Sequence, residues 1–173
     1  ALTLQLMARD GFGPGTSRPR PRVIDVGCGW GTTLEDLEAR GLDVAGLDVA
    51  ERGLRRLDRP ARRLIVADLS KPLTPPDRFD VVLALDVIEH LDDDETAVAN
   101  LAALLAPGGL LILSAPARPD LFSHFDEIQG HRRRYLPDRI ESLVRRPELT
   151  EPRVFWWGAW MVPLMKARRG RRG

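Results

Sequence analysis

The sequence predicts a doubly wound α/β fold, in which helices cover both faces of a mostly parallel sheet. Two observations lead to this prediction. Short apolar runs alternate along the chain with segments of helical periodicity, and polar or glycine residues bound each run. The runs stay apolar over successive positions, as expected of strands buried on both faces of a parallel sheet.

Five runs have the length and composition of such strands. They are Arg22–Val26, Val44–Leu47, Arg63–Ala67, Phe79–Leu85 and Leu110–Ser114. Two leucine pairs with helical spacing predict short helices after the first and second of these strands, Leu34 with Leu37 and Leu54 with Leu57.

The longest expected helix precedes the fifth strand. Its apolar stripe is formed by Val98, Leu101 and Leu105, and it opens in the acidic run Asp92–Glu95. Negative charge in the first turn suits the positive end of a helix dipole. Pro107–Gly109 is expected to end this helix and to turn the chain into the next strand.

Less regular segments flank this alternation. Residues 1–21 are expected to form a short apolar segment and a flexible linker, because Gly11–Arg22 is rich in glycine, proline and arginine. Pro137 is expected to begin a helix, since proline is favoured in a first helical turn. A sixth strand is expected at Arg153–Trp157, followed by a basic tail over residues 161–173.

The composition fits one ordinary globular domain. The chain has 173 residues, of which 43% are hydrophobic and 29% are charged. Its 26 lysines and arginines nearly balance its 25 acids, so net charge gives no reason to expect a nucleic-acid partner. A single cysteine excludes an internal disulfide and favours a reducing, cytoplasmic location. The first apolar run, Leu2–Met7, is too short for a signal peptide.

A glycine-rich run, Val23–Gly31, lies where the first strand gives way to the first helix. Gly27, Gly29 and Gly31 allow a sharp turn and let a ligand approach the backbone. A tight structural turn would use the same residues. A dinucleotide-binding fingerprint would need its third glycine three positions after the second, at Thr32, whereas here it comes after two.

An acidic residue, Asp25, precedes these glycines. The resulting pattern, Asp-x-Gly-x-Gly-x-Gly, resembles that of class I S-adenosylmethionine-dependent methyltransferases, whose fold is Rossmann-like. The resemblance continues through Asp48 and Asp68, each of which ends an apolar run, and covers residues 22–114 most clearly. Taken alone, either acid has a simpler explanation, as a helix cap or a turn former. We therefore expect a methyltransferase domain over residues 22–160.

The resemblance implies S-adenosylmethionine as the cofactor and assigns residues to it. Asp48, next to Val49, would accept hydrogen bonds from the two ribose hydroxyls, and a carboxylate is well suited to two such donors. Asp68 would meet the adenine amino group, Leu69 would contact the same ring, and Leu85 and Asp86 would lie near the methionine end. The full expected set is Asp25, Gly27, Cys28, Gly29, Gly31, Asp48, Val49, Asp68, Leu69, Leu85 and Asp86.

A hydroxyl acceptor would need a base, and histidine is the usual candidate near neutral pH. His131 is the first candidate and His90 the second, because the segments that hold them commonly border the acceptor in this family. Both have structural alternatives. His131 would form salt bridges and hydrogen bonds, and the Glu89-His90 pair would cap the acidic helix. No metal site is expected.

Several absences favour a small-molecule acceptor over nucleic acid. No Asn-Pro-Pro-Tyr or Asp-Pro-Pro-Tyr follows the fourth strand, and the only cysteine lies in the glycine loop. Arg132–Arg134 would either bind an acidic acceptor or lie in solvent. The rival functions are a cofactor-binding module without catalysis and a nicotinamide-dependent oxidoreductase.

The family's sheet normally has seven strands, so the last strands are expected to lie beyond this chain or to be missing. The tail offers a further idea. Trp156, Trp157, Trp160 and nearby methionines precede five basic residues. They would either cover the core or contact an anionic membrane surface. Membrane contact would make lipid-like acceptors plausible, as in the ubiquinone-biosynthesis O-methyltransferases that this core also resembles.

Overall fold

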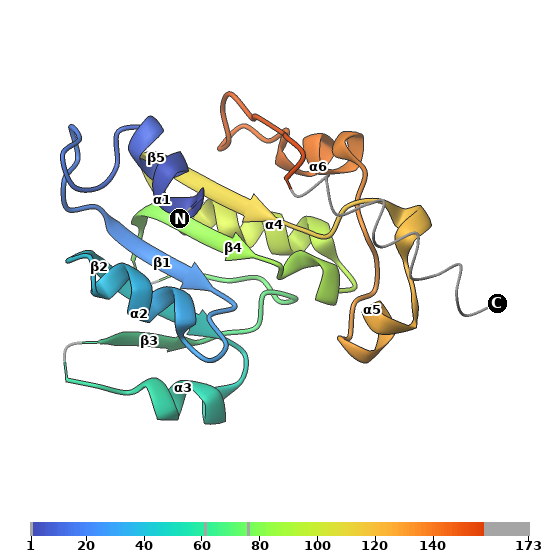
Figure 1. The fold of residues 1–173 in the computed structure, drawn as a ribbon, viewed down its shortest axis with the longest axis horizontal. Helices are drawn as coiled ribbons and strands as arrows, with labels where there is room; N and C mark the ends of the chain where they lie inside the picture. Colours follow the sequence, from blue (N-terminus) through green and yellow to red (C-terminus); the bar gives the residue numbers. More distant parts are fainter. Residues whose placement is uncertain (1, 61, 76, 158–173) are drawn as a thin grey trace.

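A computed structural model describes residues 2–60, 62–75 and 77–157. Its centre is a five-stranded sheet in the order β3-β2-β1-β4-β5, with every neighbouring pair parallel (Figure 1). The strands are β1 (Arg22–Val26), β2 (Asp43–Asp48), β3 (Arg63–Val66), β4 (Phe79–Leu85) and β5 (Leu105–Ser114). The predicted doubly wound fold and its first five strands are confirmed.

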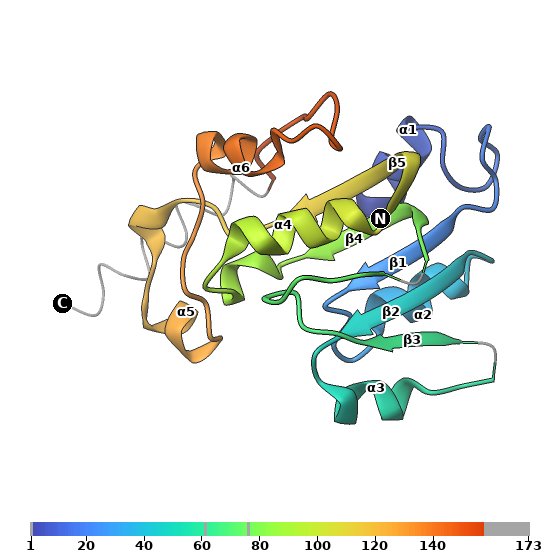
Figure 2. The ribbon, with the colours of Figure 1, turned by 180° about the vertical axis from the view of Figure 1, so that it is seen from behind.

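Helices cover both faces of this sheet (Figures 1 and 2). Helices α1 (Leu2–Arg9), α2 (Thr32–Glu38) and α3 (Glu51–Leu57) share a buried cluster with Val23, Val81 and Leu83. Helices α4 (Asp94–Ala103) and α6 (Pro137–Val144) share a second cluster with Ile24, Val82 and Ala84. Alternate residues of β1 and β4 thus serve opposite faces, which explains why these runs carry apolar residues on both sides.

Three short helices complete the described chain. They are η1 (Ile88–His90), η2 (Pro119–Leu121) and α5 (His124–Ile128). Figure 1 shows α5 and its neighbouring loops beyond the carboxyl ends of the strands. No helix within the described residues is both long and apolar enough to cross a membrane.

The first part of the chain packs against the sheet. Met7 of α1 and Phe12 are buried in the cluster of the first face. In the segment expected to be a linker, the Gly13 amide donates to the Arg18 carbonyl at 2.8 Å, and Arg18 Nη1 donates to the Gly108 carbonyl at 2.8 Å. These contacts connect the segment to β5.

The expected end of the longest helix was wrong. Helix α4 ends at Ala103, and β5 already begins at Leu105. Pro107–Gly109 lies within β5, where the pairing with β4 shifts register between Phe79 and Val81. A bulge accommodates the extra residues, and Gly108 adopts a φ of 69° there. The turn residues therefore mark a strand irregularity instead of a helix terminus.

The strand expected at Arg153–Trp157 was also wrong. Residues 152–157 have no regular secondary structure, and Trp157 is 71% exposed. Arg153 forms an ion pair with Asp10, just after α1, so this segment is held toward α1 instead of pairing with β5. Without a paired neighbour, its consecutive apolar residues have no sheet face to cover. The expected helix from Pro137 is confirmed as α6.

Candidate functional site

The candidate site lies at the carboxyl ends of the strands. The strand order reverses between β1 and β4, and ligands of open parallel sheets bind at such a reversal. The residues expected to bind a cofactor all lie at the ends of β1 to β4 or in the loops that follow them. Parallel pairing brings these loops to one edge of the sheet, although the residues are spread over much of the chain.

Two of the loop glycines are required by packing. Gly27 and Gly31 have φ angles of 73° and 79°. A Cβ on Gly27 would lie 2.6 Å from Val87, and a Cβ on Gly31 would lie 2.6 Å from Leu57. Gly29 differs, because a Cβ there would meet no atom closer than 3.9 Å. Gly29 therefore leaves one side of the loop open to an approaching ligand.

Asp48 connects the first two loops. Its Oδ2 accepts a hydrogen bond from the Gly29 amide at 2.9 Å, and its Oδ1 accepts one from the Ala50 amide at 2.8 Å. These bonds fix the carboxylate between the glycine loop and the start of α3. A carboxylate oxygen can accept more than one bond, so both oxygens keep capacity for hydroxyl donors. The next residue, Val49, is 66% exposed.

The acid at the end of β1 has a different environment. Asp25 is only 3% exposed, and burial, with a smaller contribution from the charge of Asp48, raises its pKa to about 7. Cys28 is also buried, and burial raises the pKa of its thiol to about 12, so a reactive thiolate is disfavoured. Cys28 is thus a packing residue of the loop.

Asp68 and Leu69 follow β3 in a turn that α4 holds in place. Asp68 Oδ1 accepts hydrogen bonds from the Ser70 amide and hydroxyl, chiefly the latter, and these lower the pKa of Asp68. Asn100 of α4 donates from Nδ2 to the Leu69 and Lys71 carbonyls at 2.9 and 2.8 Å. Sequence reasoning missed Asn100. Its signal was a polar residue on the buried side of an apolar helix.

Leu85 ends β4, and Asp86 follows it with a φ of 56°, which is uncommon for a residue other than glycine. The Asp86 amide donates to the Ser114 carbonyl at 3.1 Å, and the Ser114 hydroxyl donates to Asp86 Oδ1 at 3.0 Å. The ends of β4 and β5 thereby hold this carboxylate in a strained position beside the loop. Such backbone strain often accompanies functional sites.

The two candidate bases, His90 in η1 and His131 after α5, lie together. The rings of His90 and His131 meet edge to face, with centroids 4.8 Å apart. His131 Nδ1 lies 3.1 Å from Oδ1 of Asp126, which is fully buried. Burial alone would raise the pKa of Asp126, but hydrogen bonds from Arg134, Ser123 and His131 lower it overall. The carboxylate therefore stays charged and can orient His131.

Glu89 stands out beside these histidines. Its side chain is fully buried, and neither carboxylate oxygen has a hydrogen-bond partner among the described residues. Burial raises its pKa to about 7. The expectation that the Glu89-His90 pair caps the acidic helix was wrong. The cap of α4 is Asp93, which accepts from the Glu95 and Thr96 amides.

Neither expectation for the arginine cluster describes all of its members. Arg134 is 9% exposed and donates to Asp126 at 2.7 Å, while Arg133 lies 3.5 Å from the buried Asp94. Arg132 alone is largely exposed, and it pairs with Asp92 at 3.2 Å. Two of the three arginines thus neutralise buried acids, which is the arrangement that a buried charge requires.

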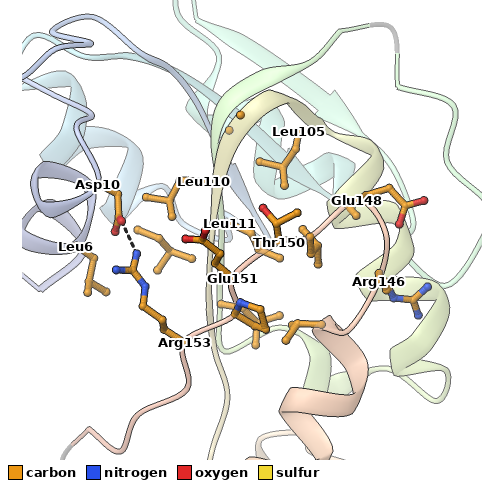
Figure 3. A pocket seen from close by; sticks show the side chains of 18 of the residues that line it. Leu6, Asp10, Leu105, Leu110, Leu111, Arg146, Glu148, Thr150, Glu151 and Arg153 are labelled. Atoms are coloured by element: carbon orange, nitrogen blue, oxygen red, sulfur yellow. Dashed lines mark hydrogen bonds and ion pairs between the residues drawn. The ribbon is translucent and has the colours of Figure 1, made fainter.

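A cavity in the described part of the chain lies elsewhere. It measures about 620 Å³ and is bordered by α1, β5 and the segment after α6 (Figure 3). Leu6, Leu110 and Leu111 supply apolar walls, and the ion pair of Asp10 with Arg153 crosses its rim. None of the expected cofactor-binding residues lines it. We place the candidate site at the strand ends, because the oriented polar groups converge there.

Comparisons with known proteins agree with this fold. A family described as methyltransferase domain matches residues 5–160. The ubiquinone biosynthesis O-methyltransferase of Alkalilimnicola ehrlichii is 34% identical over 102 residues, which cover 54% of this chain and 40% of that protein. That of Bradyrhizobium diazoefficiens is 34% identical over 98 residues, covering 54% and 39%. The chain therefore spans well under half of these relatives.

Solved structures are similar over a larger part of this chain. An amino pentose methyltransferase of calicheamicin biosynthesis from Micromonospora echinaspora, solved with SAM bound, is 30% identical. It has a TM-score of 0.58 and covers 70% of this chain and 52% of that one. DesVI of Streptomyces venezuelae is 26% identical, with a TM-score of 0.57 and coverage of 70% and 51%.

Proposed function

This chain belongs to the methyltransferase domain family, and from that premise we propose that it binds S-adenosylmethionine and methylates an oxygen or nitrogen of a small molecule. The observation that carries the proposal is the convergence at one sheet edge of the glycine loop and of Asp48, which is bonded to the Gly29 amide. S-adenosylmethionine supplies a methyl group on a sulfonium, which is already activated for displacement. The protein's part is to bind and to orient.

The expected cofactor-binding residues divide this work. Asp48 accepts from the ribose hydroxyls while Gly29 leaves room for the approach of the sugar. Asp68 and Leu69, held by Asn100, bind the adenine ring. Leu85 and Asp86 border the methionine end, where the strained backbone of Asp86 directs its carboxylate.

We propose His131 as the base for a hydroxyl acceptor, with His90 beside it. The ionised Asp126 carboxylate can only accept, so the Nδ1 that faces it carries the proton and Nε2 carries the lone pair. A carboxylate that orients a histidine in this way is a recurrent catalytic arrangement. An amine acceptor that is already deprotonated would not need this base.

Two relatives support a small-molecule acceptor, one named for ubiquinone biosynthesis and one for an amino pentose. Because the chain spans only part of each, the acceptor of the whole protein stays within the class of hydroxyl- or amine-bearing small molecules. We take residues 22–160 as the catalytic domain and the cytoplasm as its compartment.

Calorimetric titration with S-adenosylmethionine and S-adenosylhomocysteine tests cofactor binding. Asp48→Asn should weaken binding by about 1–3 kcal/mol, the cost of leaving polar groups poorly paired. The matched control is Asp43→Asn, at the opposite end of the same strand, which should bind like the wild type. Absence of binding by the folded wild type, or equal binding by both variants, would contradict the proposal. Binding of NADH instead would favour an oxidoreductase.

Methyl transfer from labelled S-adenosylmethionine to a panel of phenols, sugars and amines tests turnover. His131→Ala should lower kcat for hydroxyl acceptors by roughly 10²–10⁴-fold and leave cofactor affinity intact. His124→Ala, a change at an exposed histidine paired with Glu127, is the control. No transfer to any acceptor by a cofactor-bound protein would instead indicate a binding module without catalysis.

We also propose peripheral contact of the C-terminal segment with an anionic membrane surface. Phe155, Trp156 and Trp157 are 54%, 49% and 71% exposed, and aromatic residues next to basic ones favour such surfaces. Trp160 and the basic tail over 161–173 lie outside the described residues. Co-sedimentation with anionic vesicles should decrease when Trp156 and Trp157 are replaced by serine, and unchanged sedimentation would contradict the proposal.

A further inference from the structure

Glu89, His90 and His131 form a cluster whose members come from two distant segments of the chain. One potential ligand atom from each lies within 4.8 Å of the others. The Arg132 amide donates to the Glu89 carbonyl at 2.7 Å, and this bond holds the segment after α5 against η1. The cluster is therefore built by tertiary contacts that bring its two segments together.

Glu89 is the unusual member. A fully buried carboxylate with no partner on either oxygen, as Glu89 is among the described residues, is rare, because burial without a hydrogen bond is costly. His90 and His131 are the groups that approach it, and each offers a ring nitrogen. A carboxylate without a hydrogen-bond partner that faces the lone pairs of two imidazole nitrogens is an environment suited to a cation.

The hydrogen bonds of the two histidines suit the same role. His90 Nδ1 lies 3.3 Å from the Gly130 carbonyl, and His131 Nδ1 lies 3.1 Å from Asp126. Since both partners can only accept, each Nδ1 carries the proton and each Nε2 carries a lone pair. Histidines that bind metals are typically held in this way, by a carbonyl or a carboxylate on the other nitrogen.

We propose that Glu89, His90 and His131 bind one divalent transition-metal ion, with Asp126 and the Gly130 carbonyl orienting the two imidazoles. Two imidazoles and one carboxylate suit Zn²⁺ and its neighbours, whereas Mg²⁺ and Ca²⁺ prefer oxygen ligands. Bonds of about 2.1 Å in a tetrahedral site set ligand atoms about 3.4 Å apart, so modest side-chain rotation closes the cluster around the ion. The proposal departs from the sequence expectation of no metal.

Three protein ligands leave a fourth position open to water or to an acceptor, as in catalytic zinc sites. This last point rests on the proposed function. A hydroxyl bound at that position would lose its proton more readily, because the ion stabilises the oxyanion. With the ion bound, the Nε2 lone pair of His131 would be held by the metal, so the ion would activate the hydroxyl in place of His131 acting as a base. The metal-binding step itself requires no cofactor and no turnover.

The test is titration of the full chain, first treated with chelator, with Co²⁺ followed by visible absorption and with Zn²⁺ followed by calorimetry. The wild type should bind one ion of each, with the intense absorption of Co²⁺ in a site of low coordination number. Glu89→Gln, His90→Ala and His131→Ala should each weaken binding at least tenfold. His124→Ala and Glu127→Gln, which remove an exposed histidine–carboxylate pair, should bind like the wild type.

No stoichiometric binding by the wild type, or equal weakening by the control variants, would overturn the proposal. Far-ultraviolet circular dichroism and thermal unfolding of each chelated variant separate loss of the site from loss of the fold. S-adenosylhomocysteine titrated into the same chelated samples keeps the two proposals distinct. Metal binding without cofactor binding contradicts only the methyltransferase proposal, and the reverse result overturns only the metal site.

Discussion

Asp25 gives a direct test of the site's electrostatics. It lies at the end of β1, only 3% exposed, and burial, with a smaller contribution from Asp48, raises its pKa from 3.8 to about 7. Between pH 4 and 7 the folded protein therefore keeps a proton on Asp25 that the unfolded chain has already released. Over that range the free energy of unfolding decreases as pH rises, because the native state holds more protons. Asp25→Asn removes the ionisation.

Raising this pKa from 3.8 to about 7 lowers the free energy of unfolding at pH 8, where the native carboxyl is charged, by about 4 kcal/mol. Asp25→Asn should therefore be more stable than the wild type at pH 8 by up to that amount. For a chain of this size the difference in Tm is roughly 8–16 °C. At pH 4 both side chains are neutral in the fold, so the two proteins should unfold at nearly the same temperature.

Thermal unfolding of both proteins between pH 4 and 8, without ligand, measures the difference directly. Subtracting the two curves cancels the other titrating groups. The matched control is Asp43→Asn, at the far, exposed end of the neighbouring strand. A difference for Asp25→Asn that stays constant with pH, or that is destabilising at pH 8, would refute the reasoning from burial.

Three further substitutions test contacts around the site. Gly31→Ala should lower stability in denaturant unfolding by about 2–4 kcal/mol, because the new Cβ is strained and collides with Leu57. Gly41→Ala has a similar φ but open space around it, so it should cost only about 1 kcal/mol. Equal losses of stability in the two variants would contradict the predicted collision with Leu57. Asn100→Ala should lower stability by about 2–4 kcal/mol and weaken S-adenosylhomocysteine binding, because buried backbone groups lose their partners. Unchanged binding by calorimetry would contradict the second effect. Asp94→Asn should cost about 1.5–3 kcal/mol, because it weakens the charge-assisted hydrogen bonds that the buried carboxylate accepts from Arg139 and Tyr135. The adjacent helix cap change Asp93→Asn should be nearly neutral, and a chemical denaturation series that ranks the two otherwise would contradict this.

Local patterns were enough to predict the sheet. Strands buried on both faces need continuous apolar runs, and such runs have few alternative structures when glycine or polar residues bound them. The end of the longest helix was mispredicted because Pro107–Gly109 serves equally well as a helix terminator and as a bulge. The choice depends on pairing with β4, which is a long-range contact.

The strand at Arg153–Trp157 failed for a related reason. A short apolar segment becomes a strand only when a sheet edge accepts it, and here Arg153 is paired with Asp10 instead. The positions of the cofactor-binding candidates followed from the sequence, because the carboxyl ends of parallel strands share an edge. The roles of those residues stay proposals.

The acceptor side was the least predictable part. Nothing local to Glu89 indicates that its carboxylate is buried and unpartnered, or that His131 lies beside it. Both facts depend on how the segment after α5 folds back over η1. Polar side chains such as Asp126 and Asp94 look like ordinary surface acids in the sequence, and only the fold reveals them as the buried partners of arginines.

The stretch from Ser123 to Arg139 is braced internally and tethered to the domain, and both kinds of contact affect its motion. Asp126 joins Ser123 and Arg134 within the stretch, and Asp94 of α4 holds its last part through Tyr135 and Arg139. Swinging the segment outward would expose the Asp94 carboxylate and break its contacts with Tyr135 and Arg139 together with the Arg132–Glu89 backbone bond, so its opening should be costly. The hydrogen-bonded amides of Arg132 and Tyr135 should then exchange with deuterium more slowly than those of an untethered loop. A rigid wall of this kind selects its ligand by a preformed shape, and not by closing over it as a lid.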